Sequence, residues 1–151
     1  MPQGMLAHID LSVADPSRSI SFYDALLGSL GYQRWRATGD DWQEPNPTRA
    51  AWGLRYEDGS SFGIDLRPAT VELDRRYNRY APGPHHSAFQ VDSDSEVDRL
   101  FALMKNVDAE VLDPPANYGG QSGYGKHYYA AFFADPDGYK IEIVHATNEW
   151  L

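Results

Sequence analysis

The chain has 151 residues, no cysteine and a formal net charge of −9, with 13 Lys and Arg against 22 Asp and Glu. The absence of cysteine excludes disulfides and thiolate chemistry, so any metal must be held by His nitrogen and carboxylate oxygen. The acidic charge repels phosphate backbones and argues against nucleic acid as a partner. A hydrophobic content of 42% predicts a folded globule, and no apolar run reaches the length of a membrane span. We therefore expect no membrane partner and a cytoplasmic location.

The first half of the chain predicts a strand, a helix and three further strands. Alternation of apolar and polar residues indicates that His8 lies on the polar face of the first strand. Asp15-Pro16 is typical of a helix start, with a capping carboxylate before a proline at the first helical position. In the last strand of this half, Asp65 lies on the face opposite the apolar side chains. The expected elements are a strand at 5–13, a helix at 16–30, a strand at 32–37, a loop at 39–49, and a hairpin of strands at 51–56 and 62–66.

After a connector, the second half predicts the same order of elements. Ser93-Asp-Ser-Glu96 is a capping box at the start of the second helix. The final hairpin turns at Asp135-Pro136-Asp137-Gly138, so both aspartates are interpreted as turn residues. Glu142 lies on the face opposite the isoleucines of the last strand, either as a solvated edge residue or as a metal ligand or catalytic base. The expected elements are a strand at 86–92, a helix from 94 to about 108, a strand at 110–112, a loop at 113–126, and strands at 128–134 and 139–145.

The two halves form an internal repeat. Superposing His8-x-x-Leu-x-Val on His86-x-x-Phe-x-Val also superposes the two helix starts. The last strands superpose as well, with Asp65 over Glu142, and all four side chains face away from the helices. A pseudo-twofold relating two such modules would curl their sheets into an open barrel and gather the four residues on its concave face. Two imidazoles and one or two carboxylates there would form a divalent-metal site with nitrogen and oxygen ligands.

These segments resemble the vicinal oxygen chelate superfamily, also called the glyoxalase/bleomycin resistance protein/dioxygenase fold. The resemblance rests on four stretches: His8-Ile-Asp-Leu-Ser-Val-Ala-Asp15, Phe22-Tyr-x-x-Leu-Leu-Gly-x-Leu-Gly31, His86-Ser-Ala-Phe89 and Phe133-x-Asp-Pro-Asp-Gly-x-Lys-Ile-Glu142. It implies a single α+β domain over 1–151, with one βαβββ module at 1–69, a connector at 70–84 and a second module at 85–151. The modules are expected to form a curved, open-barrel-like mixed sheet with a concave metal cup, usually in a homodimer.

The resemblance also implies a ligand set. In metal-dependent members the ligands are a His on the first strand of each module and a Glu on the last strand, which correspond here to His8, His86 and Glu142. Glyoxalase I-like members add a Glu from the first module, and the matching position here is Asp65. We therefore expect one divalent ion per chain, of Zn, Ni, Mn, Mg or Fe(II), with Glu142 and Asp65 as catalytic residues. Because Asp is one methylene shorter than Glu, Asp65 reaches the ion either directly or through water.

The function implied is that of a glyoxalase-like lyase or isomerase acting on a small oxygenated metabolite. Chelation of substrate oxygens by the metal would polarise a carbonyl or stabilise an enolate, while a carboxylate moves the proton. One alternative is an Fe(II) ring-cleaving dioxygenase, for which His8, His86 and Glu142 suffice. Another is a non-catalytic protein of the bleomycin-resistance kind that binds a drug or metabolite. The complete ligand set argues against simple sequestration, and two modules instead of four argue against an extradiol dioxygenase.

Several further residues are assigned by strand periodicity. If both hairpins are tight, the residues expected to line the substrate cup are Trp52, Tyr56, Arg67, Tyr129 and Phe133. Arg67 shares the face of Asp65 and either binds an anionic substrate or pairs with that carboxylate. The remaining histidines are interpreted as non-ligands: His85 as a structural residue or one at the entry to the site, His127 as a surface residue or an outer partner of the site, and His145 as a packing or surface residue.

Overall fold

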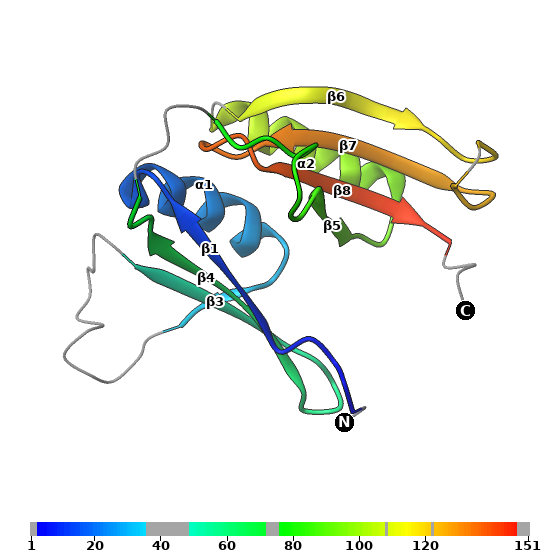
Figure 1. Ribbon diagram of the computed structural model, residues 1–151. Helices are drawn as coiled ribbons and strands as arrows, with labels where there is room; N and C mark the ends of the chain where they lie inside the picture. Colours follow the sequence, from blue (N-terminus) through cyan, green and yellow to red (C-terminus); the bar gives the residue numbers. More distant parts are fainter. Residues whose placement is uncertain (1–2, 36–48, 72–75, 108, 122, 148–151) are drawn as a thin grey trace. The chain divides into compact units, whose positions relative to one another are not determined.

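The computed structural model describes residues 3–35, 49–71, 76–107, 109–121 and 123–147 (Figure 1). The chain divides into two compact units, Met1–Asp74 and Arg75–Leu151. Nearly all of the loop predicted at 39–49 lies outside the described residues, as does the end of the strand predicted at 32–37. Among the described helices, none is long and apolar enough to cross a membrane.

The first unit is a four-stranded mixed sheet with one helix. The strand order is β1-β4-β3-β2, in which β1 runs parallel to β4 and the other neighbours are antiparallel. This is the βαβββ topology that the sequence predicts. The elements are β1 (His8–Val13), α1 (Pro16–Ser29), β2 (Gln33–Arg34), β3 (Ala50–Arg55) and β4 (Ser61–Pro68).

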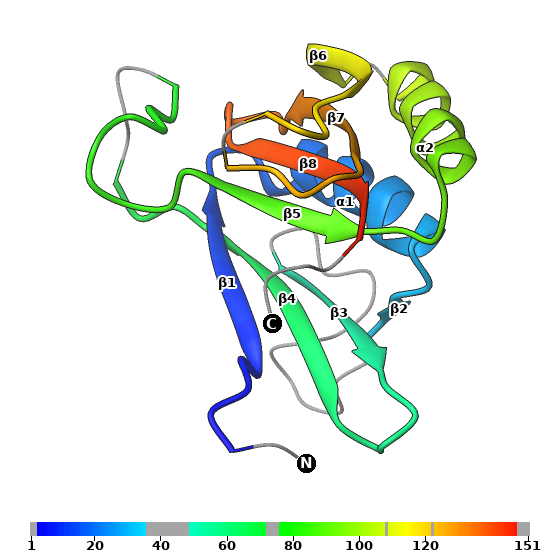
Figure 2. The same cartoon turned by 90° about the vertical axis from the view of Figure 1, so that its right-hand side faces the viewer.

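The second unit repeats this topology, with strand order β5-β8-β7-β6 and a parallel pair formed by β5 and β8. Helix α2 lies along one face of its sheet (Figure 2). The α+β fold built from two βαβββ modules is thereby confirmed. The elements are β5 (His86–Gln90), α2 (Asp94–Asn106), β6 (Glu110–Asn117), β7 (Tyr128–Ala134) and β8 (Lys140–Ala146).

Strand β6 is longer than predicted. The sequence favours a loop from Asp113 because Pro114-Pro115 removes two backbone donors, yet the strand continues to Asn117. The pairing of β6 with β7 shifts register between Val111 and Asp113 and again before Ala116. An edge strand tolerates proline at such irregularities, because only one side of it must be hydrogen bonded.

Both helix starts follow the predicted capping chemistry. The side chain of Asp15 accepts a hydrogen bond from the backbone N–H of Arg18 at 3.2 Å, and Pro16 opens α1. In α2 the hydroxyl of Ser93 accepts from the N–H of Glu96 at 3.3 Å. These caps satisfy backbone donors that the first helical turn leaves unpaired, so each helix starts directly after the first strand of its unit.

The hairpin between β7 and β8 is held by a buried carboxylate. Asp135 is 3% exposed, and its Oδ1 accepts from the backbone N–H groups of Asp137 at 2.9 Å and Tyr139 at 2.8 Å. Gly138 has φ = 93°, a left-handed conformation that glycine adopts without strain. The turn fixes the register of the hairpin, in which Phe132 lies opposite Glu142.

The substitution Asp135→Ala should destabilise the protein by about 2–4 kcal/mol, because the two N–H groups would lose a charged acceptor inside the fold. Asp135→Asn keeps a side-chain oxygen and should cost about 1 kcal/mol. Urea denaturation followed by circular dichroism measures both values. Equal stability of the wild type and the alanine variant would contradict this account of the turn.

Candidate metal centre

Glu142 lies in the middle of β8 with 2% of its surface exposed. Its Oε2 lies 3.0 Å from Nε2 of His86, and its Oε1 accepts a hydrogen bond from the hydroxyl of Tyr128. Strand β8 is flanked by β5 and β7, so Glu142 is not a residue of a solvated edge strand. A carboxylate buried this far is costly unless both oxygens are paired, and here each has a partner.

The parallel pairing of β5 with β8 explains why His86 meets Glu142. Ala88 lies opposite Glu142, and His86 lies two residues before Ala88 on the same face of the strand. With the two donor atoms 3.0 Å apart, a single ion at about 2.0–2.2 Å from each can be bound by both. The pair therefore fits two ligands of a divalent cation with nitrogen and oxygen preference.

Tyr128, which donates a hydrogen bond to Glu142, belongs to a group of neighbouring tyrosines. Burial, together with the hydrogen bond to Glu142, raises the pKa of the Tyr128 hydroxyl, so this group remains a donor at neutral pH. The ring of Tyr124 lies 4.5 Å from that of Tyr128, and the ring of Tyr118 lies 5.7 Å from that of Tyr124, measured between centroids. Aromatic rings of this kind lower the local dielectric constant, which strengthens the electrostatic interactions of Glu142.

His85 is positioned to orient His86. The Nδ1 atoms of the two rings lie 2.7 Å apart, so one donates a hydrogen bond to the other. Nε2 of His86 faces Glu142. Burial, followed by the positive charges of His86, Lys140 and Arg79, lowers the pKa of His85, which favours the neutral imidazole as a hydrogen-bond partner. An outer hydrogen bond of this kind fixes the orientation of a metal-binding histidine.

The equivalent residues of the first unit have different partners. His8 lies opposite Gly63, and Asp10 lies opposite Asp65, at the position that Ala88 has in the second unit. Asp10 Oδ2 pairs with Arg67 Nε at 2.7 Å, and its Oδ1 lies 4.0 Å from Nε2 of His8. Burial and the charge of Asp10 raise the pKa of Asp65 more than His8 and Arg67 lower it. Arg67 thus pairs with Asp10, a residue that the sequence analysis did not select.

A depression of about 320 Å³ lies beside His8 and Asp65. Ala51, Gly53 and Gly63 border it, and a Cβ atom on Gly63 would approach that of His8 to 3.5 Å. Small side chains on the two central strands therefore leave room beside the polar residues. A cavity of this size suits a small molecule.

Two aromatic residues expected to line the cup in the second unit point to α2 instead. Phe133 is fully buried with its ring 5.6 Å from that of Phe101, and the hydroxyl of Tyr129 donates to Asp98 at 3.0 Å. The prediction placed them on the wrong face. Because the hairpin pairs even-numbered with even-numbered residues, Tyr128 and Phe132 share the face of Glu142.

The same pairing rule applies to Trp52 in the first unit. Trp52 lies opposite Ile64 on the face that packs against α1, and its Nε1 donates to Asp24 at 2.8 Å. It borders the depression, yet its indole belongs to the core. Tyr56 is 44% exposed in the turn between β3 and β4, where its N–H donates to the carbonyl of Ser60 at 2.9 Å.

A second group of possible metal ligands lies in the second unit, and the sequence does not predict that its three residues are close together. Donor atoms of Asp94, His127 and His145 all lie within 4.8 Å of one another. The sequence predicts His127 as a surface residue or an outer partner of the site, His145 as a packing or surface residue, and Asp94 as part of a capping box. No spacing in the sequence links them, because they come from a helix start and two strand ends.

The structure therefore brings His86 and Glu142 into contact in the second unit, and places His8 and Asp65 on one face of the first sheet. Each pair occupies repeat-equivalent positions, as the sequence indicates. An ion shared by all four residues stays a prediction.

Comparisons with known proteins agree with the fold of two βαβββ modules. A family model for the Glyoxalase/Bleomycin resistance protein/Dioxygenase superfamily matches residues 5–143. The chain belongs to this superfamily.

The chain is also similar to individual proteins over most of its length. The chain is 26% identical over 138 residues to the uncharacterised protein YqjT of Bacillus subtilis, covering 91% of this chain and 95% of that one. It is 29% identical over 143 residues to a lactoylglutathione lyase of Haemophilus influenzae, covering 92% and 90%. A crystal structure of a glyoxalase/bleomycin resistance protein from Albidiferax ferrireducens matches the fold with a TM-score of 0.63 at 24% identity, over 94% of this chain and 99% of that one.

The raised pKa of Asp65 predicts a pH-dependent stability. Below the ordinary aspartate pKa of about 3.9, the group is protonated in both folded and unfolded states and costs nothing. As pH rises through the higher folded-state pKa, the folded state is progressively destabilised. In metal-free protein, Asp65→Asn should be more stable than wild type at pH 7, and this difference should vanish as pH falls below about 4.

Asp58 provides a control of opposite sign for this pH experiment. Hydrogen bonds from Ser60 lower the pKa of Asp58, so Asp58→Asn should be less stable than wild type at pH 7. Chemical denaturation of the three proteins in chelator, at a series of pH values, measures both differences. An Asp65→Asn protein less stable than wild type at pH 7 would show that the Asp65 carboxylate is stabilising.

Proposed function

We propose that this protein is a metal-dependent enzyme of the vicinal oxygen chelate type, which catalyses a glyoxalase-like lyase or isomerase reaction on a small oxygenated metabolite. The observation that carries the proposal is the buried contact of Glu142 with His86 at 3.0 Å. The proposed ligands are His8, His86 and Glu142, with Asp65 bound directly or through water. When bound, a divalent ion would polarise a substrate carbonyl and stabilise negative charge on its oxygen.

The residues of the chain have separate tasks in this proposal. Glu142 holds or moves the substrate proton, while Tyr128 keeps its carboxylate oriented by donating to Oε1. Asp65 is proposed as a second proton carrier. His85 holds the ring of His86 through the contact between their Nδ1 atoms.

The substrate proposed is small and carries oxygen atoms. The depression beside Asp65 holds about 320 Å³, and Arg67 lies on the same face as Asp65 with half of its side chain exposed. Its Nε pairs with Asp10, and its other N–H groups are proposed to bind a carboxylate or another anionic oxygen group of the substrate. The similarity to a lactoylglutathione lyase over most of both chains supports lyase chemistry, which makes lactoylglutathione the first compound to assay.

Replacement of Glu142 tests the proposal directly. Glu142→Gln should lower turnover about 100-fold or more and also reduce the metal content, because a neutral amide is a poor base and a weaker ligand. Metal content is measured by inductively coupled plasma mass spectrometry, and turnover by chromatography of lactoylglutathione and of a panel of small oxygenated compounds. Tyr128→Phe is the matched control, which keeps the carboxylate and should retain the metal.

Asp65→Asn separates lyase chemistry from the alternatives. In a lyase or isomerase it removes a proton carrier, so activity should fall strongly while most of the metal remains bound. Activity on a catechol that survives this substitution would indicate an iron dioxygenase, since His8, His86 and Glu142 would still form a complete ligand triad. Ligand binding that is unchanged by both substitutions and by EDTA would indicate a non-catalytic binding protein.

We further propose that the active unit is a homodimer. Each open sheet has edge strands whose backbone groups a second copy can pair with or cover. Light scattering during size-exclusion chromatography at micromolar concentration should therefore give twice the mass of the chain, with metal bound. A fully active, metal-loaded monomer under the same conditions would contradict the proposal.

A further inference from the structure

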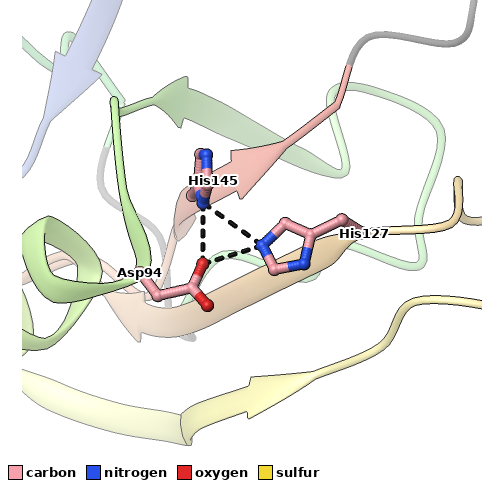
Figure 3. A group of neighbouring side chains, drawn as sticks. All are labelled: Asp94, His127 and His145. Carbon is pink, nitrogen blue, oxygen red and sulfur yellow. Dashed lines mark hydrogen bonds and ion pairs between the residues drawn. The ribbon is translucent and has the colours of Figure 1, made fainter.

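Asp94, His127 and His145 converge on a single point in the second unit (Figure 3). Asp94 is the first residue of α2, His127 directly precedes β7, and His145 lies near the end of β8. Oδ1 of Asp94 lies 2.8 Å from Nε2 of His127 and 2.7 Å from Nδ1 of His145. The two nitrogens lie 3.2 Å apart. Three separate segments thus bring one donor atom each to the same place.

The distances match those between ligands of one small cation. Zinc binds His nitrogen at about 2.0–2.1 Å and carboxylate oxygen at about 2.0–2.2 Å, so neighbouring ligands lie roughly 2.9 Å apart in octahedral and roughly 3.3 Å apart in tetrahedral coordination. The three observed separations of 2.7–3.2 Å lie within about 0.3 Å of the octahedral spacing and within about 0.6 Å of the tetrahedral spacing.

Hydrogen bonds to Oδ1 leave the two ring nitrogens crowded together. If both imidazoles donate to Oδ1, two N–H groups must point at one oxygen from nitrogens only 3.2 Å apart. If one ring turns its lone pair to the oxygen, that contact is repulsive. Asp94 is held in its charged, ligand-competent form, since hydrogen bonds from His145 and His127 lower the pKa of its carboxyl group.

The surroundings permit a cation to enter and to remain. The side chains of Asp94, His127 and His145 are 44%, 32% and 27% exposed, so the open coordination positions face water. The positive end of the α2 dipole opposes a cation only weakly, because water screens the helix end.

We propose that Asp94, His127 and His145 form a binding site for a divalent transition-metal ion of the Zn²⁺ class. The site is distinct from the His86–Glu142 pair, because strand alternation puts Glu142 and His145 on opposite faces of β8, about 10 Å apart along the strand. Two imidazoles and a carboxylate are the ligands that zinc accepts in sites with an open position for water. Binding of the ion cross-links the start of α2 to the ends of β7 and β8, and stabilises the second unit.

A zinc titration of matched variants tests the site. Full-length protein is stripped with chelator and titrated with Zn²⁺ in a calorimeter, and bound zinc is counted after gel filtration. Asp94→Asn and His145→Gln should each bind one zinc equivalent fewer than wild type and lose part of the zinc-induced rise in melting temperature. Glu96→Gln removes the same charge from the same helical turn, where Glu96 pairs with Arg99, and should keep the full zinc equivalence.

Two further measurements keep this site separate from the proposed catalytic one. Glu142→Gln should retain the zinc equivalent assigned to Asp94, whether or not the enzyme proposal holds. Anomalous diffraction from zinc-soaked wild-type crystals should show a peak within ligand distance of all three side chains, which holds even if a variant fails to fold. Absence of that peak at saturating zinc, or full zinc equivalence in Asp94→Asn and His145→Gln, would overturn the proposal.

Discussion

The buried carboxylate of Glu142 is the constraint around which the second unit is arranged. A charge at 2% exposure has to be compensated on both oxygens, and the fold meets this need with His86 from a parallel neighbour and Tyr128 from an antiparallel one. Both contacts depend on register. The turn at Asp135 fixes the pairing of β7 with β8, and the crossover through α2 returns the chain so that β5 lies parallel to β8.

The two units share a topology but differ in the chemistry on their sheets. In the second unit a small residue, Ala88, lies opposite Glu142, so His86 reaches the carboxylate directly. In the first unit Asp10 has that position, where it pairs with Arg67 and raises the pKa of Asp65. The two units therefore differ at equivalent positions: one has a direct histidine–carboxylate contact and the other a charged network.

Strand β8 presents chemistry on both faces. Glu142 lies on the face shared with Tyr128 and Phe132, while His145 lies on the face that packs against α2. The first turn of α2 adds Asp94 to that second face, and the approach to β7 adds His127. Strand β8 pairs with β5 and β7, and this pairing holds Glu142 and His145 in fixed positions. Binding sites with preorganised side chains require such support.

Most of the helices and strands, the internal repeat and the face on which Glu142 lies could be predicted from the sequence. These follow from local rules: alternation in strands, helical spacing, capping at Asp15 and Ser93, and a turn at Asp135. Repeat symmetry also singled out His8, His86, Asp65 and Glu142. Strand β6 was predicted too short, because two prolines weaken the local signal while the edge position tolerates them.

Which side chains are in contact could not be predicted from the sequence, because these contacts depend on how strands and helices pack. Trp52, Tyr129 and Phe133 were placed by parity, and the observed pairing turns them towards the helices, since a shift of one residue reverses a whole strand. The partnership of Asp10 with Arg67, and the convergence of Asp94 with His127 and His145, join segments that no sequence spacing relates. Local preference specifies each element, but the contacts between elements depend on register and packing, which emerge when the strands pair and the helix docks.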